Sequence, residues 1–171
     1  MVDKPRIGFA RQLARKILKD CSIIQPPVNL QNIVSKLGYI YIEVPNFPDR
    51  VDALFIEKDR EKYIAVNADH HPHRKRFSTA HELGHIQMGH TLEYYDEPIS
   101  MENPITEKIH SEKEKNLETE ANTFAGELLV PLEILKVEFR KTHDIDELSK
   151  VFFCEFASYE HSHYESSKIT V

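Results

Sequence analysis

Apolar residues recur at helical spacing near the start of the chain, alternate at strand spacing in the next part, and return to helical spacing in the second half. This pattern predicts helices over 8–19, 29–36, 72–88, 114–129 and 132–150. β-Branched and aromatic runs predict short strands over 39–44, 52–57 and 63–67. The order of these elements predicts an α+β fold, with helices packed on a small, mostly antiparallel three-stranded sheet.

Length and composition indicate one domain. The chain has 171 residues, of which 40% are hydrophobic and 29% are charged, so it can bury a core of ordinary size. We therefore expect a single domain over 1–171, in which the tail from about 153 to 171 shows no clear pattern. The net charge of −6 argues against direct binding to nucleic acid, which requires a basic face.

Several features indicate a cytoplasmic protein with no membrane partner. No apolar run approaches the length that crosses a bilayer. Residues 1–18 mix basic and apolar side chains, as an amphipathic helix does and a signal peptide does not. Cys21 and Cys154 lie far apart in the sequence, which is typical of two reduced thiols.

The sequence HELGH at 81–85 lies inside the expected helix 72–88. His81 and His85 are four positions apart and share one helix face, so both imidazoles can bind one metal ion. Glu82 lies about 100° around the helix from His81, where it can act as the general base on a water molecule. The pattern is the signature of zinc peptidases. Because five-residue patterns also arise by chance, the rest of the chain has to support this hypothesis.

A third metal ligand is expected from another element, because a catalytic zinc uses three protein ligands. The expected helix 114–129 offers Glu118 and Glu120. Glu118 lies about 50° from the centre of the apolar stripe and Glu120 about 110°, so Glu118 is expected to face the interior and bind the metal. Glu120 is the alternative ligand. Asn122 is expected to support the site, by orienting the carboxylate or capping a neighbouring backbone group.

Gly84 is expected to mark a close approach by another helix, because glycine inside a helix costs about 1 kcal/mol. The strand before the motif helix is expected to be an edge strand that lines the cleft and pairs with an extended substrate, which would bring Tyr63 and Ala65 to the substrate. Tyr94 and Tyr95 lie in the expected long loop 90–113 and are candidates to clamp the substrate; packing of that loop onto the domain is the alternative.

The oxyanion that forms during peptide hydrolysis needs a hydrogen-bond donor. The candidates lie in or beside the same loop, and the sequence does not choose among them: they are His90, Tyr94, Tyr95 and His110.

Several segments together resemble the ImmA/IrrE family of zinc metallopeptidases. They are ALFI at 53–56, IAVN at 64–67, RFSTAHELGH at 76–85, ExEANxFA at 118–125 and ELLVP at 127–131. The resemblance covers about residues 8–150, and its two longest motifs are specific when they occur together.

The resemblance implies a zincin-like metallopeptidase with a gluzincin-like core. It implies one Zn²⁺ per chain bound by His81, His85 and Glu118, with Glu82 as the catalytic residue. It further implies a cytoplasmic endopeptidase that regulates transcription by cleaving a protein substrate, a helix-turn-helix repressor. Two alternatives stay open: another divalent metal, and a non-catalytic, zinc-stabilised module that regulates a transcription factor by contact.

Overall fold

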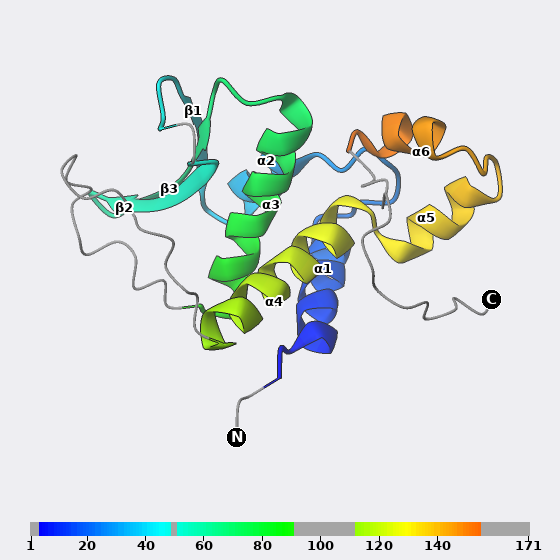
Figure 1. The fold of residues 1–171 in the computed structure, drawn as a ribbon, viewed down its shortest axis with the longest axis horizontal. Helices are drawn as coiled ribbons and strands as arrows, with labels where there is room; N and C mark the ends of the chain where they lie inside the picture. Colours follow the sequence, from blue (N-terminus) through cyan, green and yellow to red (C-terminus); the bar gives the residue numbers. More distant parts are fainter. Residues whose placement is uncertain (1–3, 49–50, 91–111, 155–171) are drawn as a thin grey trace.

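The described part of the chain, residues 4–48, 51–90 and 112–154, folds into six helices and one three-stranded sheet in this computed structural model (Figure 1). The strands are β1 (Ile40–Val44), β2 (Ala53–Lys58) and β3 (Glu61–Asn67). The helices are α1 (Ile7–Asp20), α2 (Leu30–Lys36), α3 (Pro72–Met88), α4 (Glu112–Leu129), α5 (Leu132–Phe139) and α6 (Ile145–Phe152). The α+β class expected from the sequence is confirmed.

Local signals in the sequence determine where α2 and α3 begin and end. The Asn29 side chain caps α2 by accepting a hydrogen bond of 3.0 Å from the backbone nitrogen of Asn32. Pro72 starts α3, where its missing N–H is not needed. Gly38 follows α2 with a φ of +83°, and Gly89 ends α3 with a φ of +68°; both values favour glycine. The motif helix therefore has the bounds that the sequence predicts.

The sheet has the strand order β1-β3-β2 and is mixed rather than mostly antiparallel. β3 pairs in parallel with β1, where Ala65 lies opposite Ile42. On its other side β3 pairs with β2 in the antiparallel direction, where Ala65 lies opposite Leu54. β2 and β3 form a tight hairpin, in which Asp59 and Arg60 have φ values of +53° and +69°.

β3 is the central strand, so the expectation of an edge strand that offers Tyr63 and Ala65 to an extended substrate is wrong. β1 and β2 occupy both of its edges and use its backbone hydrogen-bonding groups. Ile64, Ala65 and Val66 are all completely buried, as is usual for a strand covered on both faces. An added strand would have to pair with the outer edge of β1 or β2.

The apolar core lies where α1, α3 and α4 meet, and it extends to α2 and β3. Figure 1 shows α3 and α4 crossing at the centre of the molecule, with α1 beside α4. The large side chains buried there are Ile33, Ile64, Leu83, Phe124 and Leu128. The two helices that carry the expected metal ligands therefore belong to the best-packed region. Within the described ranges no helix combines the length and apolar character needed to cross a bilayer.

The segment expected to be helical over 132–150 is helical in two parts, α5 and α6, which lie at the end of the molecule opposite the sheet (Figure 1). The helical segment is interrupted because Asp144 caps a new helix. Its side chain accepts hydrogen bonds from the backbone nitrogens of Asp146 and Glu147. Leu148 and Phe152 of α6 form a small apolar cluster separate from the main core. From residue 155 the uncertain tail lies outside the described residues.

α3 and α4 approach each other closely at Gly84, as expected for a glycine inside a helix. A Cβ atom at Gly84 would lie 3.1 Å from both the Cα and the carbonyl oxygen of Ala121, and 3.2 Å from Phe124. Two of these three neighbours are backbone atoms, which cannot turn away as a flexible side chain can. Gly84 therefore sets how closely the two helices pack.

Gly84→Ala should lower the free energy of unfolding by about 1–3 kcal/mol, because overpacking against backbone outweighs the better helix propensity of alanine. Gly126→Ala is the matched control. Gly126 also lies inside a helix, but a Cβ there has no atom within 4 Å, so the control should gain up to about 1 kcal/mol. Urea unfolding of the zinc-free proteins measures both. An equal gain in the free energy of unfolding in both variants would mean that α4 shifts to make room for the added methyl group at position 84.

Candidate metal centre

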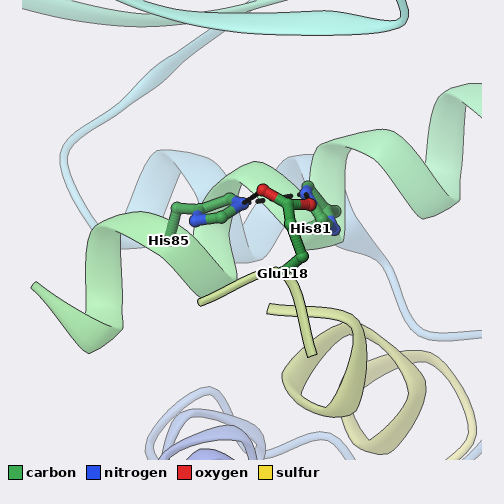
Figure 2. Close-up of side chains that lie close together, drawn as sticks. All are labelled: His81, His85 and Glu118. Carbon is green, nitrogen blue, oxygen red and sulfur yellow. Dashed lines mark hydrogen bonds and ion pairs between the residues drawn. The ribbon is translucent and has the colours of Figure 1, made fainter. Parts of the chain in front are cut away.

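The two motif histidines lie one turn apart on α3 and point to the same side. Their ring centroids are 4.5 Å apart, and the two Nε2 atoms face each other at 2.8 Å. Glu118 of α4 reaches the same point from the neighbouring helix (Figure 2). Its Oε2 lies 3.2 Å from Nε2 of His81 and its Oε1 lies 3.3 Å from Nε2 of His85. One ligand atom from each residue lies within 4.8 Å of the others.

The approach at Gly84 explains why Glu118 reaches the histidines. Gly84 stands between His81 and His85 in the motif, and it contacts Ala121, which lies one turn after Glu118 on α4. A larger residue at position 84 would push α4 away and take the carboxylate with it. The packing of the core and the geometry of the site therefore depend on the same contact.

The two candidate glutamates of α4 differ in burial, but not in the way that the helical phase predicts. The Glu118 side chain is 48% exposed, whereas the Glu120 side chain is 4% exposed. The expectation that Glu118 faces the interior is wrong, because α1 packs beside α4 and Arg6 covers the side on which Glu120 lies. A catalytic metal needs an open position, so partial exposure of one ligand is compatible with such a site.

Glu120 is fully engaged away from the three-residue cluster. It accepts hydrogen bonds from the backbone nitrogen of Arg6 at 2.7 Å and from the Arg6 guanidinium at 2.7–3.1 Å. Nε2 of His90 lies 2.9 Å from the same carboxylate. Burial alone would raise the pKa of Glu120, but these hydrogen bonds outweigh burial and lower the pKa to about 2. The carboxylate is therefore ionised and has its own partners.

Each motif histidine is held through its second ring nitrogen. Nδ1 of His81 lies 2.9 Å from Oδ1 of Asn122, and Nδ1 of His85 lies 2.9 Å from Nδ1 of His90. Asn122 thus supports an imidazole, rather than the Glu118 carboxylate or a backbone group. His90 was a candidate oxyanion donor, but its side chain is only 1% exposed and both ring nitrogens contact protein groups. The other candidates, Tyr94, Tyr95 and His110, lie outside the described residues.

The residues that are present fit a metal ion. When each Nδ1 carries the hydrogen that it donates to its neighbour, both Nε2 atoms carry lone pairs, and these face each other beside a carboxylate. Acceptors that converge without a donor repel one another unless a cation lies between them. Two imidazole nitrogens and one carboxylate oxygen form the donor set of a catalytic zinc, which leaves one position for water. The set also suits iron, manganese or cobalt.

Electrostatics link the three residues of the cluster. In the absence of a metal ion, an Nε2 atom that carries a hydrogen donates it to Glu118, and these contacts with His81 and His85 hold the pKa of the Glu118 carboxyl far below its ordinary value. Burial would lower the pKa of His81, but the hydrogen bond and the charge of Glu118 outweigh it, so the pKa of His81 is raised.

Glu82 follows the first motif histidine and lies against the cluster without joining it. Its Oε2 is buried and has no hydrogen-bond partner among the described residues. Burial raises the pKa of Glu82, against the opposing charges of His81 and His85. A buried carboxylate without a partner is costly, so such an atom in a native fold points to a role in binding or catalysis. A raised pKa suits a group that both takes and returns a proton.

The sequence did not predict the roles that two residues of this arrangement have in the structure. His90 directly follows Gly89, which ends the motif helix, and this closeness to the motif was the one signal in the sequence that His90 could contact a motif histidine. Arg6 gave no signal, because its partner lies 114 positions away. Only the packing of α1 beside α4 brings the two residues together.

The fold and this donor set together define a zincin-like metallopeptidase domain. A peptidase family model, described as the IrrE N-terminal-like domain, matches residues 39–165. The chain belongs to this family of zinc-dependent metallopeptidases, which confirms the resemblance seen in the sequence.

Comparison of structures shows the same fold in a longer protein. A Mycobacterium tuberculosis transcriptional regulator superposes with a TM-score of 0.62 at 18% sequence identity. The match covers 86% of this chain and 44% of that one, so this chain spans less than half the length of the regulator. No curated protein matches the sequence.

After loading with zinc and dialysis, we expect the wild type to retain one ion per chain. Glu118→Ala should lose it, because two histidines alone cannot hold a catalytic zinc. Glu127→Ala is the control, since Glu127 lies on the same helix and pairs with Arg15 instead. Atomic absorption measures the metal in each protein. Equal zinc in the two variants would remove Glu118 from the site.

Proposed function

We propose that this protein is a zinc-dependent endopeptidase, in which His81, His85 and Glu118 bind the metal and Glu82 is the catalytic residue. The observation that carries the proposal is the buried, unpartnered Oε2 of Glu82 beside a three-residue cluster with one half-exposed ligand. The cluster suits a metal, the exposed side suits entry of water and substrate, and the carboxylate suits proton transfer. Membership of a metallopeptidase family supports the same conclusion.

Zinc, when bound here, lowers the pKa of a water molecule towards about 7 and polarises the substrate carbonyl. Glu82 accepts a proton from the water as its oxygen adds to the carbonyl carbon of the peptide. Glu82 then donates that proton to the amide nitrogen as the carbon–nitrogen bond breaks. The products are a carboxylic acid and an amine, and Glu82 returns to its starting charge.

The surrounding residues keep these groups in place. Asn122 fixes the ring of His81, and His90 fixes the ring of His85, so both present Nε2 to the same point. Gly84 keeps α4 close enough for Glu118 to complete the set. These residues position the reacting groups and do not themselves touch the peptide.

The proposed substrate is a helix-turn-helix transcriptional repressor. Two observations support this choice: the ImmA/IrrE resemblance in the sequence, and the structural likeness to a protein described as a transcriptional regulator. The net charge of −6 favours action on a regulatory protein over direct contact with DNA. Contact of Tyr94 and Tyr95 with the substrate remains a prediction from the sequence.

Glu82→Gln should keep zinc and stability but slow cleavage by at least about 100-fold, because the amide fills the same space and cannot take a proton. The assay follows cleavage of purified helix-turn-helix repressors encoded next to this chain's gene, by mass spectrometry. Glu133→Gln is the control, since Glu133 is an exposed glutamate on α5. If Glu82→Gln still relieves repression in cells, the protein acts as a zinc-stabilised binding module instead.

A further inference from the structure

A continuous chain of contacts leads from the start of α1 to the metal centre. Arg6 binds Glu120 through its backbone nitrogen and its guanidinium, with closest distances of 2.7 Å. Glu120 Oε2 lies 2.9 Å from Nε2 of His90, and Nδ1 of His90 lies 2.9 Å from Nδ1 of His85. Nε2 of His85 then faces His81 and Glu118. The contacts connect α1, α4, the end of α3 and the metal centre.

Hydrogen-bonding rules give this chain one direction. His85 must keep a lone pair on Nε2 to bind a metal, so its hydrogen lies on Nδ1 and is donated to Nδ1 of His90. His90 then carries its own hydrogen on Nε2 and donates it to the Glu120 carboxylate. Each tautomer therefore fixes the next, and the negative charge of Glu120 lies at the end opposite the metal.

Burial keeps water out of the chain of contacts. The side chains of His85, His90 and Glu120 are 3%, 1% and 4% exposed. Within the described residues, Arg6 is the cation that pairs with the Glu120 carboxylate. The guanidinium makes a forked contact, which restricts the rotation of the carboxylate. Arg6 therefore holds Glu120 where His90 needs an acceptor.

We infer that Arg6, Glu120 and His90 are positioning residues that fix the tautomer and orientation of His85, so that the first turn of α1 controls the affinity of the site for metal. This inference rests on the proposed metal site. It adds residues that act through His85 and never touch substrate. Arg6 and α1 precede residues 39–165, so the inference assigns a function to a part of this chain that lies outside the match to the family model.

The protein contains a matched control for this inference. Arg15 of α1 pairs with Glu127 of α4 at 2.8 Å and 3.3 Å, in the same forked geometry. Exposure also matches: the arginine side chains are 51% and 50% exposed, and the glutamates are 4% and 8% exposed. Both pairs join the same two helices, but among the described residues the Arg6 pair alone is connected to a motif histidine. Any general effect of loosening α1 should appear in both pairs.

The experiment measures the zinc dissociation constant by competition with a chromogenic chelator, and the absorption spectrum of the cobalt-substituted protein. Glu120→Gln should weaken zinc binding about tenfold, and Arg6→Gln should weaken it several-fold, as expected for groups that orient a ligand. Both should change the cobalt spectrum. Glu127→Gln and Arg15→Gln should stay within about twofold of wild type. Circular dichroism of the zinc-free proteins reports folding.

The outcomes separate the inference from the proposed function. If wild type binds zinc and the two sets of variants bind it equally, the positioning role is overturned while the metal site stands. If wild type binds no zinc, both fail. Should Arg6→Gln not fold, Arg6→Lys serves in its place, because lysine keeps the charge but lacks the fork. The inference then requires zinc affinity between those of wild type and Glu120→Gln, and wild-type affinity would overturn it.

Discussion

The backbone contact between α3 and α4 at Gly84 is the constraint on which the site depends. It lets two helices approach so closely that a Cβ atom at this position would lie only 3.1 Å from the backbone of Ala121. The same approach packs Phe124 and Leu128 into the core and carries Glu118 to the motif histidines. Stability and metal geometry therefore arise from one packing event. A helix pair held this closely gives the proposed metal site little freedom to lose its third ligand.

The two motif histidines have different environments. His81 is held by the neutral amide of Asn122, whereas His85 is held through His90 by a carboxylate with its own arginine. An acceptor with negative charge strengthens the electron donation of an imidazole more than an amide does. His85 is also the more deeply buried of the two, so it is the more strongly fixed of the two proposed ligands. His81 and the half-exposed Glu118 form the side that faces solvent.

Much of the fold and the centre of the site follow from the sequence, because both rest on local patterns. The motif helix, its glycine end and the three strands depend on neighbours along the chain. The central position of β3 does not, since it requires the parallel pairing with β1, a segment beyond the β2–β3 hairpin. The run of three consecutive apolar residues, Ile64, Ala65 and Val66, was the signal in the sequence for a central strand. The burial of Glu120 could not be predicted, because it depends on Arg6, 114 positions earlier.

α1 lies before residues 39–165, which the family model matches, yet Ala10, Ala14, Ile17 and Leu18 belong to the main core. The recognisable segment and the cooperative folding unit are therefore not the same stretch of chain. A piece beginning at residue 39 would carry the whole HELGH motif and Glu118, but the side of α4 that α1 covers would face water. Such a piece would keep the sequence signature of the family but lose α1, which packs against α4. Boundaries drawn from the sequence motifs alone would therefore cut through the core of this protein.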